Sequence, residues 1–369
     1  MSLFGSKKTD VVAGTLGVDI GDSGVKIVEV VPESGRLRLV TYGYSEPNAD
    51  NVLKPVVVDP PTAAAGIIRQ IIASSGMKAT HAAAALPCAS VFHAIITVPI
   101  PKSSKDDLRP VIEAQARKIL PLPLEEMILD SHVLDKELLP TVPAKEPSTA
   151  LAPTARHIRV QITGAPKSLV AKYVELFKAA KLDLVSLETE AFALLRSLVG
   201  KDASRVMVVD IGSERTNIII AEKGVPFLAR VVKTGGGSVT SALASSLGVG
   251  VAEAETMKKD MTFQEAGLMP PVIEVAIKPL IHELRYALEL YADQDFHENR
   301  TVDKIILTGG SSLIPGLVKA VTAALNVNCY LGDPWARIAT QPEARAVFDE
   351  VGTKFAVAAG LAMRAKDEK

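Results

Sequence analysis

The chain has 369 residues, of which 41 are basic and 42 acidic, and its formal net charge is −1. This balance argues against a nucleic-acid-binding face. Its two cysteines, Cys88 and Cys329, are too few for a disulfide framework or a cysteine metal cluster, so a reducing compartment is expected. Neither a secretory signal nor an uninterrupted apolar run of roughly 18 residues is found, so no membrane span is expected.

The first predicted element is a β-hairpin over residues 18–28, in which an apolar strand ends in Asp19 and Gly21 opens a tight turn. Glycine adopts the backbone torsions of such a turn and lets a phosphate approach the main chain, whose N–H groups can cradle it. A carboxylate beside the phosphates can hold Mg²⁺, usually through water. The hairpin therefore indicates a phosphate site with Asp19 as a candidate metal ligand.

Residues 86–183 read as a smaller unit that combines strands, among them residues 91–98, with a helix from about residue 104. Within it, residues 139–156 are rich in Pro, Ala and Thr and are expected to form a mobile loop. An apolar stripe at three- and four-residue spacing then predicts a helix that buries Val170, Val174, Phe177 and Ala180.

A second copy of the hairpin pattern covers residues 209–219, with Asp210 and Gly212 in the places of Asp19 and Gly21. Asp-x-Gly after an apolar run is also common in ordinary hairpins, so one copy alone would favour a purely structural turn. The two copies match over about ten positions and lie in separate halves of the chain. This repeat favours two turns that face each other across a cleft and clamp phosphates.

Two further glycine turns precede predicted helices. Residues 235–237 are three consecutive glycines, and residues 309–310 are a Gly-Gly pair between the buried strand 304–308 and Ser311. The Gly-Gly backbone leaves room for a flat ligand, and a helix N-terminus favours negative charge. These turns predict a binding surface for the rest of a nucleotide.

A helix between these turns places Glu255 and Lys258 on one face, because the two residues are three positions apart. A carboxylate can accept hydrogen bonds from ribose hydroxyls, and the stem of a lysine can flank a base. Taken alone, such a pair is more often a solvated ion pair on a helix surface.

In this order, the segments resemble the actin-like ATPase superfamily, which includes actin, heat-shock chaperones, sugar kinases, FtsA and PilM. The resemblance implies an α/β fold of two duplicated ribonuclease-H-like lobes that bind ATP and Mg²⁺ between them. It implies that Asp19 and Asp210 organise Mg²⁺, and that Glu188, in a connecting helix over residues 187–193, acts as a catalytic residue that positions water or metal. The residues implied in nucleotide binding are Gly21, Asp22, Ser23, Gly24, Lys26, Gly212, Ser213, Thr216, Gly235, Gly236, Gly237, Glu255, Lys258, Lys259, Gly309, Gly310 and Ser311.

The segment from Leu86 to about Asp183 is similar to the extra subdomain of the PilM family, in its Glu113-Ala114, Ile119-Leu120-Pro121 and Leu129-Asp130 runs. The resemblance implies a first lobe, an insertion within it, a second lobe with a smaller subdomain, and a C-terminal helix that returns to the first lobe. The corresponding ranges are 14–203, about 88–165, 204–340 with about 237–301, and 341–369.

Resemblance to PilM implies a cytoplasmic ATP-binding protein, peripheral to the inner membrane, that acts as an assembly platform of the type IV pilus. Its expected partner is the cytoplasmic tail of a PilN-like inner-membrane protein, with other pilus assembly proteins and self-association also compatible. The second hairpin lacks the second glycine of the chaperone ATPases, and Glu214 would bring like charge near the phosphates. ATP binding is therefore expected, with weak or absent hydrolysis.

Two other functions use the same scaffold. One is an FtsA-like cell-division filament protein, although FtsA ends in an amphipathic membrane-targeting helix that the last residues here do not resemble. The other is a small-molecule kinase, which needs a catalytic carboxylate and a polar substrate pocket beyond the nucleotide motifs. The sequence also does not distinguish a role in type IV pilus assembly from a role in type II secretion.

Overall fold

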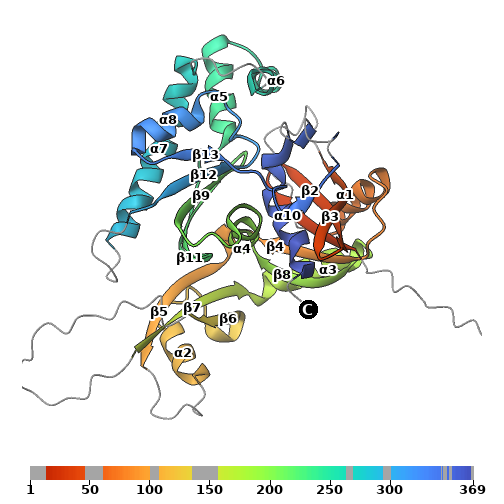
Figure 1. The fold of residues 1–369 in the computed structure, drawn as a ribbon, viewed down its shortest axis with the longest axis vertical. Coiled ribbons are helices and arrows are strands. Elements are labelled where there is room, and N and C mark those ends of the chain that lie inside the picture. The colour runs from red at the N-terminus through yellow and green to blue at the C-terminus, as the bar shows by residue number, and fades with distance from the viewer. Residues whose placement is uncertain are drawn as a thin grey trace, which may run out of the picture.

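The computed structural model describes residues 14–45, 61–99, 108–134, 157–262, 269–293, 301–341, 343, 347–348 and 351–366. These residues form three β-sheets with helices packed on them (Figure 1). No helix in these ranges is long and apolar enough to cross a membrane. The residues before 14 and the predicted loop 139–156 lie outside the described residues.

The first sheet has six strands in the order β14-β3-β2-β1-β4-β8. The strands are β1 (Thr15–Gly21), β2 (Gly24–Glu33), β3 (Arg36–Tyr44), β4 (His81–Leu86), β8 (Asp183–Thr189) and β14 (Ile338–Ala339). Strands β1, β2 and β3 are antiparallel, and β4 and β8 add to β1 in parallel. The β1–β2 turn is the predicted first hairpin, with Gly21 paired to Gly24.

Helices cover both faces of this sheet, and its central strands β1, β2 and β4 are accordingly buried along most of their length. On one face pack α1 (Pro61–Ser74) and α3 (Lys167–Ala179), and on the other α4 (Glu190–Leu194) and α10 (Ala356–Ala362). We call the sheet with these helices the first lobe.

The second sheet repeats this plan in the order β11-β10-β9-β12-β13. Its strands are β9 (Arg205–Ile211), β10 (Thr216–Glu222), β11 (Val225–Val232), β12 (Lys304–Thr308) and β13 (Cys329–Leu331). Three antiparallel strands are again followed by parallel ones, as in β3-β2-β1-β4-β8. The duplication predicted from the two hairpins is therefore confirmed.

The second lobe consists of this sheet and the helices that follow β11 and β12. They are α5 (Gly236–Leu247), α6 (Val251–Thr262), α7 (Pro271–Ala292) and α8 (Leu317–Leu325). The buried faces of α5, α7 and α8 form one core with the inward residues of the sheet. After β13 the chain returns to the first lobe before residue 341, since Ile338 of β14 pairs with Leu37 of β3.

The third sheet, β5-β7-β6, is inserted between β4 and β8 of the first lobe and lies at the lower end of Figure 1. It comprises β5 (Phe92–Pro99), β6 (Met127–Val133) and β7 (His157–Pro166), with α2 (Arg109–Ala116) and its own small core. The helix expected from about residue 104 is described from Arg109, and residues 100–107 lie outside the described residues.

Two local predictions differ from the structure. Val174 of α3 was expected to be buried, yet it is 52% exposed, because α3 packs on the sheet through Tyr173, Leu176 and Phe177 instead. The predicted connecting helix over residues 187–193 begins only at Glu190, because residues 183–189 extend the first sheet as β8. The second of these differences changes which acidic side chain reaches the cleft.

A core of small side chains joins the two lobes. Alanines of β4, α4 and α10 pack here against Val206, Val208 and Ile219 of the second sheet. Within the first lobe, α10 packs most tightly at two glycines: a Cβ on Gly17 of β1 would lie 2.0 Å from the Ala358 oxygen, and one on Gly360 of α10 would lie 1.9 Å from the Ala193 oxygen of α4. The packing of α10 on β1 and α4, beside the seam between the lobes, thus requires glycine at these two points.

We expect Gly360→Ala to destabilise the fold by about 2 kcal/mol or more, since its methyl group would overlap main-chain atoms of α4. Urea unfolding followed by circular dichroism measures this change. Gly66→Ala is the matched control, because Gly66 lies in α1 and a Cβ there meets nothing within 4 Å. This control should be neutral or stabilising by up to about 1 kcal/mol. Equal losses of unfolding free energy in both variants would contradict the tight packing of α10 on α4.

Candidate functional site

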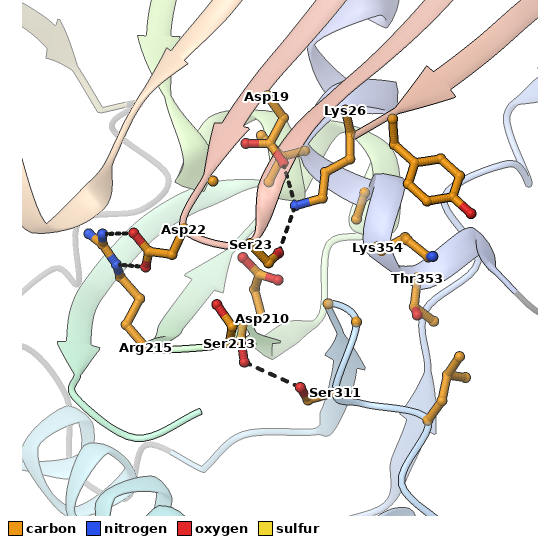
Figure 2. Close-up of a pocket in the computed structure, with 18 of the residues that line it drawn as sticks. Asp19, Asp22, Ser23, Lys26, Asp210, Ser213, Arg215, Ser311, Thr353 and Lys354 are labelled. Atoms are coloured by element: carbon orange, nitrogen blue, oxygen red, sulfur yellow. Dashed lines mark hydrogen bonds and ion pairs between the residues drawn. The ribbon is translucent and has the colours of Figure 1, made fainter. Parts of the chain in front are cut away.

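A cavity of about 500 Å³ lies between the two lobes, and both predicted hairpin turns line it (Figure 2). The first turn contributes Gly21, Asp22 and Ser23, and the second contributes Gly212 and Ser213. The Gly309-Gly310 turn and one face of α6 line it as well. Segments almost 300 positions apart in the chain therefore meet, as the repeat predicted.

In the first lobe, Asp19 and Lys26 stand on paired strands at the closed end of the hairpin. The Lys26 Nζ lies 3.8 Å from Asp19 Oδ2 and donates a long hydrogen bond of 3.5 Å to Ser23 Oγ. Burial raises the pKa of Asp19, an effect that Lys26 opposes and Asp22 increases. The pair gives this turn one buried acid and one cation that faces the cavity.

In the second lobe, Asp210 occupies the equivalent position at the end of β9. Burial, together with the nearby Asp19, raises the pKa of Asp210 to about 6. The side-chain amide of Asn217 donates to Asp210 Oδ2 at 3.2 Å and to Glu190 Oε2 at 3.0 Å. Asn217 thus links the acid of the second hairpin to a carboxylate that comes from the first lobe.

Glu190, the first residue of α4, is this carboxylate, and like Asp210 it is half-buried. Its Oε2 also accepts a hydrogen bond of 2.9 Å from the Cys88 backbone N–H. Burial, with added repulsion from Asp19 and Asp210, raises the pKa of Glu190 to about 7. Three carboxyl groups from three elements therefore share one region that is poorly solvated.

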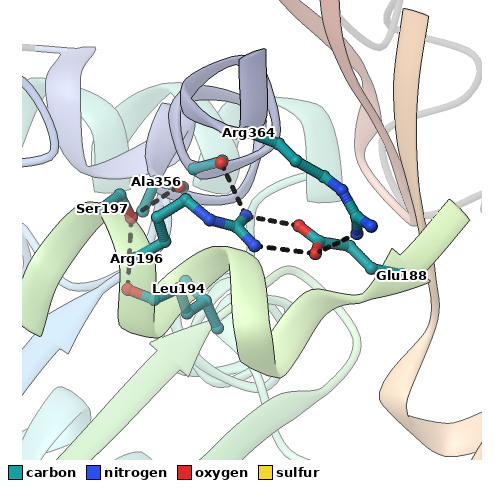
Figure 3. Close-up of polar contacts among 7 residues, drawn as sticks. Glu188, Leu194, Arg196, Ser197, Ala356 and Arg364 are labelled. Atoms are coloured by element: carbon teal, nitrogen blue, oxygen red, sulfur yellow. Dashed lines mark hydrogen bonds and ion pairs between the residues drawn. The ribbon is translucent and has the colours of Figure 1, made fainter. Parts of the chain in front are cut away.

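Glu188, which the resemblance singled out as catalytic, does not line this cavity. Its carboxylate accepts two hydrogen bonds from the Arg196 guanidinium, at 2.5 and 2.9 Å, and one from Arg364 at 2.9 Å (Figure 3). Because residues 183–189 form a strand, the side chain at 188 leaves the sheet away from the cleft, whereas Glu190 begins the helix and faces it. The acid that reaches the site is Glu190, whereas Glu188 at the end of β8 joins Arg196, which follows α4, to Arg364 of the C-terminal segment.

The Gly309-Gly310 turn forms the part of the cavity wall that lies beside the end of β9 in the second lobe. Gly309 has a φ of +86°, and a Cβ there would lie 2.5 Å from the Ile211 oxygen and 2.6 Å from Asp210 Oδ1. At Gly310 a Cβ would meet only Lys354, at 4.0 Å, so this backbone is open to the cavity. The first glycine is needed for close packing on β9, and the second leaves a flat surface uncovered.

The C-terminal segment completes this wall with Thr353 and Lys354. The Thr353 oxygen accepts a hydrogen bond of 3.1 Å from the Gly309 N–H, and the Lys354 Nζ lies 4.3 Å from the centre of the Tyr44 ring. Phe355, the next residue, packs on Tyr42 with ring centres 5.2 Å apart. The aromatic packing fixes the backbone of residues 353–354 beside the glycine turn.

On α6, Glu255 and Lys258 line the cavity, together with Lys259. The Lys258 Nζ donates to Glu255 Oε2 at 2.6 Å, to Thr240 Oγ1 at 2.9 Å and to the Gly236 oxygen at 3.2 Å. Burial lowers the pKa of Lys258, while the Glu255 carboxylate acts against this. The pair is therefore a buried network that joins α5 to α6, rather than a solvated surface pair.

Four residues predicted to contact a nucleotide do not line the cavity: Gly24, Thr216, Gly235 and Gly236. They shape its walls instead. Gly24 closes the first hairpin with a φ of +141°, and Thr216 donates 2.6 Å to the Thr234 oxygen. A Cβ on Gly235 would lie 2.5 Å from the Ser213 oxygen, and one on Gly236 2.0 Å from Ser311 Oγ.

The structure adds residues that sequence reasoning missed. Glu190, Asn217, Arg215 and Lys354 all line the cavity. Arg215 and Asn217 lie within the second hairpin, so their place in the motif was a usable signal. Glu214, which would have brought negative charge to the phosphates, is exposed and is not among the lining residues.

The side chains that line the cavity are of the types that bind a nucleotide together with Mg²⁺. Asp19, Asp210 and Glu190 provide a negative, oxygen-rich region, and the Oδ1 of Asn217 is buried beside them without a hydrogen-bond partner in the described part of the chain. No cluster of His, Cys, Asp or Glu within the described ranges is arranged to hold a metal ion directly. This donor set suits a hydrated Mg²⁺ that the carboxylates hold through water.

A family model described as type IV pilus assembly protein PilM matches residues 17–366. A chain in the solved PilM–PilN type IV pilus biogenesis complex is 26% identical, with a TM-score of 0.76 over 95% of this chain and 98% of that chain. The ethanolamine utilization protein EutJ from Carboxydothermus hydrogenoformans is 17% identical, with a TM-score of 0.52 over 94% of this chain and 88% of that one. MreB 5 of Spiroplasma citri bound to AMPPNP is 13% identical, with a TM-score of 0.50 over 96% of each chain. These likenesses confirm the predicted actin-like ATPase fold.

The raised pKa of Glu190 predicts a stability change that depends on pH. A glutamate has a pKa near 4.5 when unfolded, against about 7 for Glu190 in the folded protein. Between these values the folded state holds more protons than the unfolded state, so stability falls as pH rises, and the full penalty is present above pH 7. At about pH 8, without nucleotide, Glu190→Gln should therefore raise the free energy of unfolding by on the order of 1 to 3 kcal/mol.

Denaturant unfolding at about pH 8 and about pH 4 measures this effect, which should disappear at the lower pH. Glu188→Gln is the matched control, because its charge is paired with Arg196 and Arg364. That variant should be destabilised at the higher pH. The same sign of change in both variants would contradict the assignment of Glu190 as the unpaired, buried acid.

Proposed function

The chain belongs to the PilM family of type IV pilus assembly proteins, and from this we propose that it binds Mg-ATP between its lobes while docking a PilN-type membrane protein. It would thereby act as a cytoplasmic assembly platform, held near the inner membrane by its partner. The observation that carries the nucleotide part is the cavity on which two hairpin turns, three carboxylates and an open Gly-Gly backbone converge.

Each part of a nucleotide has a matching group in this cavity. The backbones of the two hairpin turns and the Lys26 ammonium would hold phosphates, and Asp19 and Asp210 would hold Mg²⁺ through its water shell. The ion would supply positive charge where carboxylates and phosphates otherwise repel one another. Glu255 would accept from the ribose, and the uncovered backbone at Gly310 would lie against the base.

The partner part rests on the family and on the PilM–PilN complex, whose similar chain is matched over nearly its whole length. A common fold alone would be weak support, since one fold serves many functions. Here the match includes the inserted subdomain, which lies within the residues covered by the family model. We infer that a PilN-type segment from the inner-membrane protein is the natural partner.

The inserted subdomain contacts the second lobe, which gives the nucleotide a physical route to the partner. Gln161 of β7 donates to the Pro226 oxygen of β11 at 3.4 Å, and the Arg159 guanidinium carbon lies 5.6 Å from the centre of the Phe227 ring. A change in the angle between the lobes would alter these contacts. Because a ligand shifts an equilibrium only by its differential affinity for two states, nucleotide and partner would be coupled if both depend on that angle.

Thermal unfolding tests nucleotide binding. Mg-ATP at about 100 times its dissociation constant should stabilise the wild-type protein by about 2.7 kcal/mol, seen as a rise in Tm. Asp210→Ala should lose most of this rise, because the variant lacks a carboxylate that the metal needs, whereas the exposed Glu289→Ala on α7 should keep it. A wild-type protein freed of copurified nucleotide that shows no rise would contradict the proposal.

Fluorescence anisotropy with a labelled cytoplasmic segment of the cognate PilN-type protein tests docking and coupling. We expect saturable binding whose Kd differs by about fivefold or more with and without Mg-ATP, a size typical of coupled sites. The difference should vanish in Asp210→Ala while binding itself persists. An equal Kd with and without Mg-ATP would contradict the coupling, and absence of binding would contradict the docking role.

A further inference from the structure

An ion pair crosses the cavity and connects the tips of the two hairpin turns (Figure 2). Arg215 of the second turn donates from Nε to Asp22 Oδ2 at 2.5 Å and from Nη2 to Asp22 Oδ1. The side chains are 34% and 12% exposed, respectively. A bidentate guanidinium–carboxylate pair thus joins the lobes at the place where both turns face the phosphate region.

The charged side chains around this ion pair determine which groups could attract or repel a phosphate bound between the turns. Three acids line the cavity, Asp19, Asp210 and Glu190, and the nearness of the other two is part of the reason that the pKa of Glu190 is raised. Among the described residues on the hairpins, the cations that line the cavity are Lys26, which is paired with Asp19, and Arg215, which is paired with Asp22. An anion placed between the turns therefore forms an ion pair with one of these two cations only if that cation changes partner.

Arg215 is the cation better suited to such a change. Its guanidinium is a planar fork that fits a phosphate in the same bidentate way as it fits a carboxylate. Asp22, in contrast, would bring negative charge beside the phosphates, which is unfavourable at short range. The Asp22–Arg215 pair is also the more exposed of the two pairs, so its members can separate into solvent with less desolvation.

The position of Arg215 indicates which phosphate it would meet. Arg215 interacts electrostatically with Glu190 and Tyr173, on the first-lobe side of the hairpins. The groups suited to ribose and base, Glu255 and Gly310, come from α6 and from the turn that follows β12. We infer that a nucleotide whose base lies against Gly310 directs its terminal phosphate to the hairpin turns, where Arg215 pairs with Asp22.

We propose that Arg215 exchanges Asp22 for the terminal phosphate when a nucleoside triphosphate binds, so that the ion pair acts as a latch that distinguishes triphosphate from diphosphate. The inference rests on the proposed nucleotide site and adds a residue and a regulatory contact to it. In the absence of nucleotide, Asp22 holds Arg215 and keeps the turns together. With triphosphate, the phosphate takes over the guanidinium and Asp22 is released.

A different arrangement would keep the pair intact as a permanent clasp over the nucleotide. The two arrangements predict opposite results for Asp22. If the pair is a clasp, removing either charge opens it, and both variants bind nucleotide less well. If the partners exchange, Asp22 competes with the phosphate, so removing its charge strengthens triphosphate binding while removing Arg215 weakens it.

The test compares Asp22→Asn with Arg215→Gln, each close in shape to the native side chain, by calorimetric titration with Mg-ATP and Mg-ADP. We expect Asp22→Asn to bind Mg-ATP about threefold more tightly or better, and Arg215→Gln to bind it about tenfold less tightly. Affinity for Mg-ADP should change less than about threefold in both. The double variant should bind Mg-ATP more tightly than Arg215→Gln, because it also lacks the negative charge that an unpaired Asp22 places beside the phosphates.

Urea unfolding without nucleotide verifies that the variants fold, and both should be destabilised alike because both break the same pair. Weaker Mg-ATP binding in both single variants, or equal changes for Mg-ATP and Mg-ADP, would overturn the exchange while leaving the nucleotide site in place. A wild-type protein that binds neither nucleotide would overturn the proposed function, and the exchange with it. The two failures are therefore distinguishable.

Discussion

Repulsion among three carboxyl groups at the cavity is the constraint on which the organisation of the cleft depends. Asp19, Asp210 and Glu190 come from two strands and a helix, and burial raises the pKa of each. Asp19 adds to the rise at Asp210 and at Glu190, and Asp210 adds to the rise at Glu190. A folded protein holds such groups together only when the surrounding packing compensates for their unfavourable desolvation. Hydrogen bonds from Asn217 and the Cys88 N–H provide part of that compensation. A magnesium ion would provide the remainder, which links the stability of this region to its proposed ligand.

The packing that holds these acids in place is made by small residues, both at the seam between the lobes and where α10 packs on β1 and α4 within the first lobe. Alanines of α4 and α10 and the glycines at 17 and 360 let helices and strands approach until their backbones touch. Outside the seam, Glu188 of β8 pairs with Arg196, which follows α4, and with Arg364, which follows α10. The elements that carry the site are therefore fixed by van der Waals contact and by this ion-pair cluster. The open cavity lies where this contact stops.

The second hairpin shows how the scaffold can change its electrostatics without changing its fold. It lacks a second glycine, and the positions that follow Gly212 carry Ser213, Glu214 and Arg215. Glu214 is directed to solvent, whereas Arg215 lines the cavity and pairs with Asp22 of the other lobe. The turn thus gains a cation that bridges the lobes. The charge of Arg215 in the second lobe is thereby balanced by Asp22 of the first lobe.

The sequence by itself determined the duplicated α/β architecture, the two hairpin turns and the Gly-Gly turn, because these follow from local patterns that recur along the chain. It also placed Asp19, Asp210, Lys26 and Glu255 at the cleft, since motif positions fix where a strand ends. It could not show that Glu190 rather than Glu188 reaches the cleft, because this depends on whether residues 187–189 belong to strand β8 or to helix α4. Nor could it show that Arg215 reaches Asp22, 193 positions away, or that Lys258 is buried against α5. Only the tertiary structure decided these points, since side-chain direction and long-range contact are set by how the lobes pack, and no local pattern encodes them.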